Sequence, residues 1–241
     1  MLSNAAAFTS CIETLIEGYP ERLIMVAGTD TEVGKTYVTA ALAKALVAKG
    51  FCPYILKPIQ TGVSMLEATD ASWAAQAVYQ ATQVMVPWHV GFLFPIPATP
   101  AVSDTERTLS PLAIQEVINM WVRTALQDPK AIVLCELAGG LRVPLCEGWT
   151  NLELLHHYAS QSSIVLVART ALGTLNHTLL SVERCFTEQL PLRAVILNHG
   201  SPEAYQVQTT HYPEALATVV AQLEAWLPSS LPLYGPVMPY V

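Results

Sequence analysis

Five short runs of apolar, largely β-branched residues, spaced between helical patterns, most constrain what this sequence can fold into. The expected strands are Leu23–Ala27, Tyr54–Lys57, Ile132–Glu136, Ile164–Ala168 and Ala194–Asn198. Each run is almost continuously apolar instead of alternating, which is typical of strands buried on both faces of a parallel sheet. The alternation of such strands with helices predicts an α/β fold with a mostly parallel sheet flanked by helices.

Helix signals stand between these runs. Thr36–Lys49 carries apolar residues at helical spacing and is followed by Gly50, a residue favoured just past a helix end. Ser110 and Pro111 form a cap followed by proline at the first helical position. Thr150 and Glu153 have the spacing of a capping box, and we expect a last helix over Pro213–Trp226.

Composition narrows the function classes. The 241 residues suffice for one domain, and with 52% apolar and only 13% charged residues the chain is not expected to be disordered. The net charge of −7 argues against a broad nucleic-acid surface. No stretch approaches the ~18 unbroken apolar residues of a membrane span, and the N-terminus lacks the basic region of a signal peptide. We therefore expect a soluble cytoplasmic protein, with residues 1–21 as an N-terminal extension.

The five cysteines are scattered, and no two form a Cys-x-x-Cys pair. This is the pattern of reduced thiols used as small hydrophobic residues. His156 and His157 are adjacent on an expected helix, where their side chains point about 100° apart, so a zinc site there is disfavoured.

A glycine-containing loop, Gly-Thr-Asp-Thr-Glu-Val-Gly-Lys-Thr at 28–36, joins the first strand to a helix. In this setting backbone N–H groups and the positive end of the helix hold phosphate oxygens. Lys35 would reach the β- and γ-phosphates, and the Thr36 hydroxyl would ligate Mg²⁺. The standard phosphate-loop pattern has its first glycine at position 29, where this chain has Thr29. The context nevertheless favours a nucleotide site over an ordinary turn.

Charged residues at other strand ends are candidate partners of this loop. Glu136 ends an expected strand, where phosphate loops find an acidic metal partner, and Lys57 ends another, at the edge where open α/β sheets bind ligands. Asp70 precedes the helical pattern 71–80. Each has a structural alternative: a plain strand-end carboxylate for Glu136, a solvent-facing lysine for Lys57 and a helix N-cap for Asp70.

Taken in order, the motifs of the chain resemble those of the dethiobiotin synthetases, ATP-dependent enzymes with a P-loop NTPase-like fold that close the ureido ring in biotin synthesis. The motifs lie at 28–36, 57–62, 136–140, 172–177, 197–199 and 235–239. The resemblance spans about residues 22–241 and implies one P-loop domain over that range.

The resemblance also implies a reaction. One amine of 7,8-diaminononanoate takes up CO₂ as a carbamate, ATP phosphorylates the carbamate, and the second amine attacks the mixed anhydride to give dethiobiotin, ADP and phosphate. ATP and Mg²⁺ are the implied cofactors, and a homodimer with shared sites the implied assembly. Neither nucleic acid nor membrane is an implied partner.

By the family pattern, three residues are catalytic: Lys57, Lys35 and Thr31. The implied metal ligands are Thr36, Asp70 and Glu136. The implied nucleotide-binding residues are Glu32, Val33, Gly34, Lys35, Thr36, Tyr37, Asp70, Glu136, Leu137, Ala138, Gly139, Asn198, His199, Pro239, Tyr240 and Val241. The implied substrate-binding residues are Thr61 and, from a second subunit, Leu172, Gly173, Thr174, Leu175 and Asn176.

Within these sets, Lys57 is expected to steady the carbamate and the transferring phosphoryl group. Asn198, with the chain end at 239–241, is expected to recognise adenine. Two assignments have structural alternatives, since Asn198 at a strand end is also a common turn residue, and Asn176 could cap the following helix.

The chain departs from the family at two places. Thr99-Pro100-Ala101 stands where members often have Ser-Pro-His, and Leu137 replaces a glycine, so its side chain must point away from the nucleotide or narrow the pocket. Two other functions stay open: an ATP-dependent amidoligase-like enzyme without a glutaminase domain, and a regulatory P-loop module. A partitioning-type ATP switch is disfavoured, because such proteins have a lysine at the place of Asp30.

Overall fold

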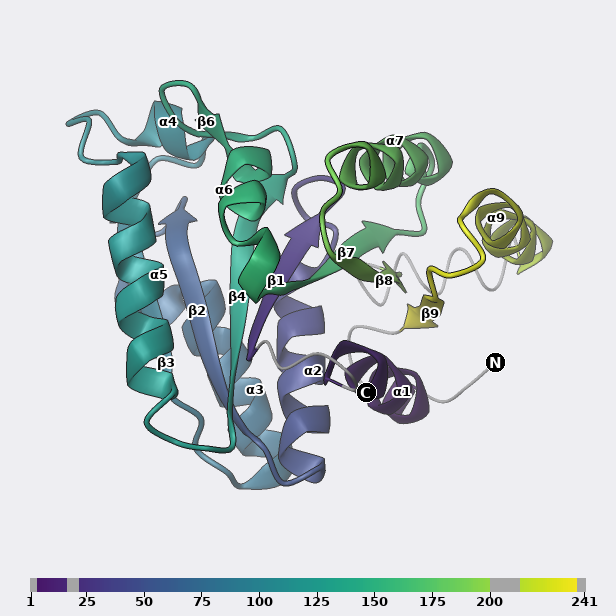
Figure 1. Ribbon diagram of the computed structural model, residues 1–241, viewed down its shortest axis with the longest axis horizontal. Helices are drawn as coiled ribbons and strands as arrows, with labels where there is room; N and C mark the ends of the chain where they lie inside the picture. The colour runs from purple at the N-terminus through teal and green to yellow at the C-terminus, as the bar shows by residue number, and fades with distance from the viewer. Residues whose placement is uncertain (1–3, 17–21, 200–212, 238–241) are drawn as a thin grey trace.

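The computed structural model describes residues 4–16, 22–199 and 213–237. Its centre is a seven-stranded sheet of order β3-β2-β4-β1-β7-β8-β9, with every neighbouring pair parallel (Figure 1). The strands are β1 Leu23–Gly28, β2 Cys52–Thr61, β3 Trp88–Phe94, β4 Ala131–Gly140, β7 Ser163–Arg169, β8 Leu192–Asn198 and β9 Leu233–Val237. The predicted fold class, a mostly parallel sheet flanked by helices, is confirmed.

All five predicted runs are strands, and two of the strands continue four residues past the end of their apolar runs. β2 continues to Thr61 and β4 to Gly140, so the polar and glycine residues of both motifs extend the strands toward the site. β3 and β9 were not predicted. β3 is an edge strand whose residues are mostly half-buried, and His89 and Gly91 interrupt its apolar character.

Helices cover both faces of the sheet (Figure 1). One buried apolar cluster joins the sheet to the first three helices, and a second joins it to helices of the opposite face. The helices of the first face are α1 Asn4–Ile16, α2 Lys35–Ala48 and α3 Asp70–Thr82. Those of the second face are α5 Pro111–Ala125, α6 Asn151–His157, α7 Thr174–Thr187 and α9 Pro213–Trp226. Short elements complete the described chain: α4 Pro100–Ser103, η1 Leu66–Ala68, η2 Ala159–Gln161 and the hairpin β5 Pro144–Cys146 with β6 Trp149–Thr150.

The expected helix ends are largely confirmed. The Ser110 hydroxyl accepts a hydrogen bond from the amide of Ala113, and Thr150 and Glu153 form the predicted capping box. Gly50 has a φ of 80° just past α2, the left-handed geometry that glycine adopts without strain. α2 begins at Lys35, one residue earlier than predicted, because Gly34 is its cap.

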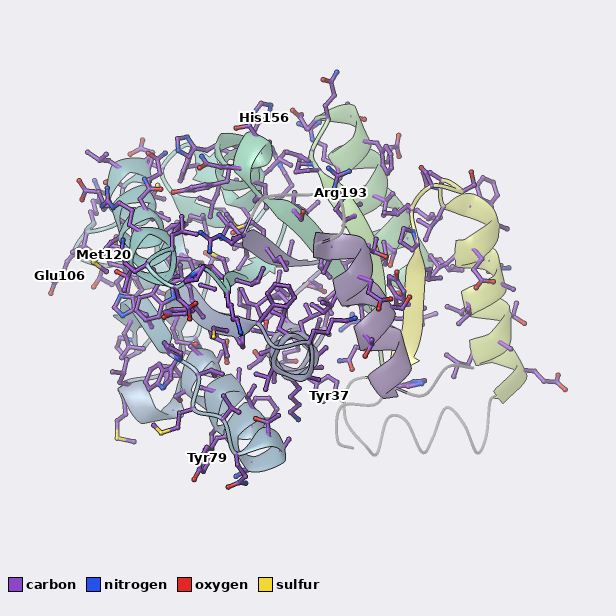
Figure 2. The ribbon with its side chains drawn as sticks, turned by 60° about the horizontal axis from the view of Figure 1, so that its bottom comes forward. Tyr37, Tyr79, Glu106, Met120, His156 and Arg193 are labelled. Atoms are coloured by element: carbon purple, nitrogen blue, oxygen red, sulfur yellow. The ribbon has the colours of Figure 1, made fainter. Side chains whose placement is uncertain are left out.

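The segment expected as an N-terminal extension contains α1, which packs beside β9 and α2 (Figure 2). Cys11, Ile12 and Leu15 are fully buried in the cluster that α1 shares with α2 and α3. The Thr14 hydroxyl lies 2.7 Å from the Tyr234 hydroxyl of β9. The division of the chain into an extension at 1–21 and a domain at 22–241 stays a prediction.

The five cysteines are free, and four of them are buried, as predicted for thiols that act as small hydrophobic residues. In the part of the chain that the structure describes, no helix has the length and apolar character needed to cross a membrane.

Candidate active site

A cavity of ≈ 990 Å³ opens at the carboxyl edge of the sheet, beside the central strand β1. The ends of β2, β4 and β8 and the start of α2 meet around it. Its lining residues are Thr31, Glu32, Gly34, Lys35, Thr36, Tyr37, Lys57, Ile59, Gln60, Thr61, Ala68, Thr69, Asp70, Trp73, Pro97, Ala98, Thr99, Pro100, Glu136, Ala138, Gly139, Val143 and Asn198. Carboxyl edges of parallel strands are the usual ligand sites of open α/β sheets.

The loop between β1 and α2 has the geometry of a phosphate cradle. Gly34 caps α2 with a φ of 90° and lines the cavity together with Lys35, Thr36 and Tyr37, so the positive end of α2 borders the cavity. The Lys35 ammonium folds back and donates to the Asp30 carbonyl at 2.9 Å. A side chain at position 28 would place its Cβ 2.8 Å from the Lys35 nitrogen. Gly28, one residue earlier than the standard pattern, is therefore the glycine that makes room for Lys35.

A buried cluster of charges lies beside this loop. The Lys57 Nζ atom is 2.6 Å from Glu136 Oε1 and 2.7 Å from Asp70 Oδ2. Glu136 also accepts hydrogen bonds from the hydroxyls of Thr36, at 2.9 Å, and Thr39, at 3.2 Å. Lys57 is only 4% exposed, so the solvent-facing alternative for it is wrong. Glu136 is 1% exposed, and it does not end its strand, because β4 continues to Gly140.

The helix cap before α3 is Thr69, not Asp70. The Thr69 side chain accepts from the amide of Ser72, which leaves the Asp70 carboxylate available for Lys57. The Asp70 amide in turn donates to Gln60 Oε1 at 3.0 Å, which ties the start of α3 to the end of β2.

The two lysines differ in protonation behaviour. Burial lowers the pKa of Lys57, but the carboxylates of Glu136 and Asp70 raise it by more, so its pKa lies above the ordinary value. Burial, followed by the neighbouring Lys57 charge, lowers the pKa of Lys35 to about 8. Two neighbouring ammonium groups, both buried, favour a polyanionic ligand.

The oxygen atoms around Lys57 fit a magnesium ion. Mg²⁺ takes oxygen ligands and is usually held by one or two carboxylates together with substrate phosphates. Thr36, Asp70 and Glu136 supply one hydroxyl and two carboxylates within the same hydrogen-bonded cluster. Among the described residues, no three or more His, Cys, Asp or Glu side chains come together as a group that could hold a metal ion.

Asn198 lies at the end of β8, at the wall of the same cavity. It is 1% exposed, and its Nδ2 donates to the Val33 carbonyl at 3.0 Å. Its Oδ1 is buried and has no hydrogen-bond partner within the described part of the chain. A buried, unpaired acceptor at a cavity wall is unlike a turn residue and suits a ligand that donates a hydrogen bond.

Comparisons with known proteins agree with this geometry. A family model described as an AAA domain matches residues 22–230. The chain is 33% identical to the ATP-dependent dethiobiotin synthetase of Methylobacterium nodulans over 213 residues, covering 83% of this chain and 88% of the relative. It is 36% identical to the corresponding synthetase of an Anaeromyxobacter species over 201 residues, covering 83% of this chain and 86% of the relative. The chain belongs to the dethiobiotin synthetase family.

The fold also matches a more distant solved structure. The signal recognition particle receptor FtsY of Elizabethkingia anophelis, in complex with GDP, superposes with a TM-score of 0.52 at 16% identity. The alignment covers 95% of this chain and 64% of that chain. At this identity the likeness shows a shared P-loop NTPase-like fold alone.

Most residues that the dethiobiotin synthetase pattern singles out line the one cavity. They are Thr31, Glu32, Gly34, Lys35, Thr36, Tyr37, Lys57, Thr61, Asp70, Glu136, Ala138, Gly139 and Asn198. Val33 is buried beneath the loop, and His199 is buried where its Nδ1 lies 3.2 Å from the Thr170 hydroxyl. Neither lines the cavity. Pro239, Tyr240 and Val241 lie outside the described residues.

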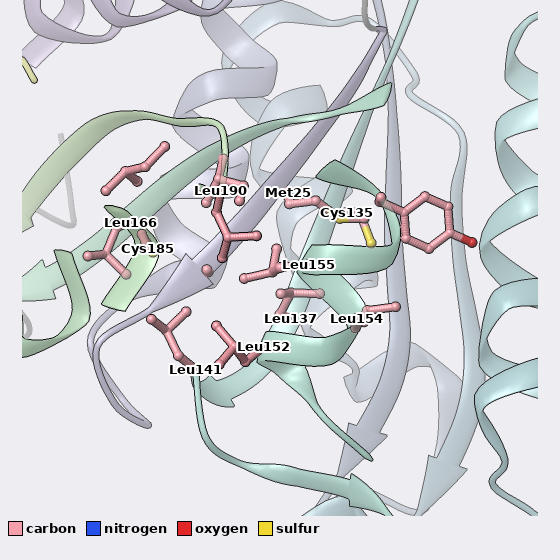
Figure 3. Close-up of a cluster of buried hydrophobic side chains, with 14 of the residues drawn as sticks. Met25, Cys135, Leu137, Leu141, Leu152, Leu154, Leu155, Leu166, Cys185 and Leu190 are labelled. Atoms are coloured by element: carbon pink, nitrogen blue, oxygen red, sulfur yellow. The ribbon is translucent and has the colours of Figure 1, made fainter. Parts of the chain in front are cut away.

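Leu137 replaces the glycine of the family pattern, but its side chain does not enter the cavity. Its side chain is 2% exposed and packs in the apolar cluster beneath β4, among residues such as Leu152 and Leu155 (Figure 3). Of the two orientations expected for it, the one directed away from the nucleotide site is therefore correct.

The loop at 172–176, which precedes and begins α7, does not line this cavity. Leu172 is 99% exposed, and Gly173 caps α7 with a φ of 92°. Asn176 lies inside the helix, so the alternative that it caps α7 is wrong. Within this chain Leu172, Gly173, Thr174, Leu175 and Asn176 lie apart from the lysine cluster.

Sequence reasoning missed part of the cavity wall. Pro97, Ala98, Thr99 and Pro100 line the cavity, although the sequence drew attention only to Thr99 and Pro100, as part of a departure from the family pattern. Ala101, the position of the family histidine, is exposed on α4 and does not line the cavity. Ile59, Gln60 and Trp73 were also missed. Gln60 and Ile59 belong to the motif at 57–62, which is the signal that could have found them.

Proposed function

We propose that this protein is an ATP-dependent dethiobiotin synthetase, which carboxylates 7,8-diaminononanoate and closes its ureido ring. The observation that carries the proposal is the buried Lys57 ammonium between Asp70 and Glu136, beside the Lys35 loop, in a member of this family. The reaction must bring a carbamate and a triphosphate together, and both are anions. Fixed positive charge in a buried site is what such an encounter requires.

In this proposal the loop at 28–36 holds the triphosphate of ATP. The amides at the start of α2 and the Lys35 ammonium bind the phosphate oxygens. The unpaired Oδ1 of Asn198 accepts a hydrogen bond from the adenine amino group, and residues 239–241 complete the base site. Val33 and the backbone of 137–139 contribute main-chain groups to the nucleotide.

Thr36, Asp70 and Glu136 would hold Mg²⁺, whose oxygen preference their donors fit. When bound, the ion supplies neutralisation of phosphate charge. The chain's own residues keep these donors ordered before the ligand arrives, because Thr36 and Lys57 both bond to Glu136.

Lys57 acts on the reacting groups. Its raised pKa keeps the ammonium protonated, so it serves as fixed charge and hydrogen-bond donor and not as a base. It steadies the carbamate while a carbamate oxygen bonds to the γ-phosphorus and the bond from that phosphorus to ADP breaks. The second amine then bonds to the carbonyl carbon of the mixed anhydride, loses its proton, and phosphate leaves. Thr31 and Thr61, both at the cavity wall, orient the substrate through their hydroxyls.

The loop at 172–176 would act on the partner subunit's cavity in a cytoplasmic homodimer. The exposure of Leu172 and the position of the loop at the N-terminus of α7 support this role, since the positive end of a helix suits the far carboxylate of the substrate. Co-expression of Lys57→Ala and Asn176→Ala chains tests it. Shared sites predict that the mixed dimers regain part of the activity that each variant lacks alone, whereas sites made within one chain predict no such recovery.

The test of the function is a mass-spectrometric assay with 7,8-diaminononanoate, bicarbonate, Mg²⁺ and ATP, with each component omitted in turn. Dethiobiotin that forms only in the complete mixture supports the proposal. Binding of ATP with no dethiobiotin contradicts it, and favours an amidoligase-like enzyme with another substrate or a regulatory P-loop module.

A further inference from the structure

Asn198 touches the phosphate loop directly as well as facing the cavity. Its Nδ2 donates to the Val33 carbonyl at 3.0 Å, across 165 residues of sequence. The Asn198 backbone is itself fixed, because it pairs with Arg169 in the sheet and its carbonyl accepts from the Thr170 amide at 3.1 Å. The side chain is buried, so it has little freedom to release the loop.

The Val33 carbonyl belongs to the same peptide group as the Gly34 N–H. A trans peptide is planar, and its C=O and N–H point in opposite directions. A hydrogen bond that holds the Val33 carbonyl toward Asn198 therefore holds the Gly34 N–H away from Asn198. The Gly34 N–H is one of the amides that would bind phosphate. If this peptide rotated, a carbonyl oxygen would face the phosphate where an N–H should be.

Position 34 has room only for glycine beside Asn198. A Cβ at position 34 would lie 1.8 Å from Asn198 Nδ2, and the φ of 90° also disfavours any side chain there. The close approach between β8 and the loop thus depends on both residues together.

We infer that Asn198 is a positioning residue for the phosphate loop, one that sets the orientation of the 33–34 peptide so that the Gly34 N–H faces phosphate. The inference rests on the proposed use of the loop at 28–36 for ATP, and it adds a role to the adenine contact proposed for the Oδ1 of Asn198. One amide side chain then links the base side of the site to its phosphate side.

Inorganic tripolyphosphate separates the two roles, because it has no base. Its binding is measured by isothermal titration calorimetry for the wild type and Asn198→Ala, alongside turnover at saturating ATP. Asn198→Ala is expected to weaken tripolyphosphate binding about tenfold and to lower kcat as well as raise KM for ATP. If tripolyphosphate binding and kcat are unchanged and only KM for ATP rises, Asn198 acts only through its contact with the base. That result would overturn the inference.

A double-mutant cycle with Gly34→Ala excludes a general structural effect. The strain of alanine at a φ of 90° is present in both backgrounds and cancels in the cycle. The clash with Asn198 is present only when Asn198 is intact. The loss of tripolyphosphate affinity caused by Gly34→Ala should therefore be smaller in the Asn198→Ala background than in the wild-type background. Additive losses would contradict a direct contact.

Ser162→Ala is the matched control. This variant removes a buried hydroxyl that donates to the Tyr158 carbonyl, at 2.8 Å, and that does not line the cavity. It should bind tripolyphosphate within about twofold of the wild type, and an equal loss there would overturn the inference. Failure of the wild type itself to bind tripolyphosphate would instead count against the phosphate loop, and with it the proposed function.

Discussion

The Lys57 ammonium and the Glu136 carboxylate lie 2.6 Å apart, and both side chains are almost completely buried. A buried ion pair gains little net stability, because removing two charges from water offsets most of their attraction. Asp70 and Thr36 complete the hydrogen bonding of the pair. The arrangement is better explained by the charge it holds ready for an anionic ligand than by its contribution to folding.

Replacing Lys57 is expected to lower the turnover rate much more than the affinity for ATP. Lys57→Met keeps most of the side-chain volume and removes the charge. We expect kcat to fall about 10²–10³-fold, the usual cost of losing a group that stabilises transition-state charge, with ATP affinity changed less than about threefold. Steady-state kinetics and calorimetry measure the two effects. Lys49→Met, which removes an ammonium paired with Glu13 on α1, is the control and should retain full turnover. Near-normal turnover in Lys57→Met would contradict the assigned role.

Thr36 tests the metal assignment. Thr36→Ala removes the hydroxyl that donates to Glu136, whereas Thr36→Ser keeps it. We expect the tightening of ATP binding by Mg²⁺ to be reduced about tenfold or more in the alanine variant and largely retained in the serine variant. Titrations of ATP with Mg²⁺ and with a chelator give the comparison. An equal metal dependence in wild type and Thr36→Ala would remove Thr36 from the ligand set.

The lowered pKa of Lys35 predicts a pH dependence of ATP binding. With a pKa of about 8 in the free protein, Lys35 is charged below that pH and loses its charge above it. The triphosphate favours the charged form, so ATP affinity should be highest below about pH 8 and should fall as the pH rises through 8 to 9. Calorimetry at pH 8.5 in two buffers of different ionisation enthalpy should detect proton uptake on binding.

A variant without the Lys57 charge is the control for the predicted pH dependence of ATP binding. That charge is a cause of the lowered pKa, second only to burial. In Lys57→Met the fall in ATP affinity should therefore move to higher pH. A pH profile with no proton uptake, or one that moves to lower pH in the variant, would exclude Lys35 as the titrating group.

Much of the site was predictable because two of its charged residues follow buried apolar runs. Lys57 and Glu136 each lie four residues before the end of a strand, and the carboxyl ends of parallel strands meet at one edge of a sheet. Which strands are neighbours was not predictable from the runs. β2 and β4 are adjacent in the sheet, and only this order brings the two side chains to 2.6 Å.

Other features carried no local signal. Leu137 lies in a motif of site residues, and its inward direction depends on the register of β4 over the apolar cluster. The loop at 97–100 is proline-rich like many surface loops, and its place at the cavity follows from the end of β3 beside β2. The burial of α1 depends on β9, more than 200 residues further along the chain.

The contact of α1 with the sheet gives a prediction about stability. Ile12 is fully buried among residues of α2 and the sheet, whereas its neighbour Glu13 is exposed. Ile12→Ala should lower the free energy of unfolding by about 2–5 kcal/mol, the range for truncating a buried aliphatic side chain. Glu13→Ala removes only an exposed ion pair with Lys49 and should change it by less than about 1 kcal/mol. Urea denaturation followed by circular dichroism measures both. Equal stability of the two variants would mean that α1 does not contribute to the core, and that the sheet is stable without it.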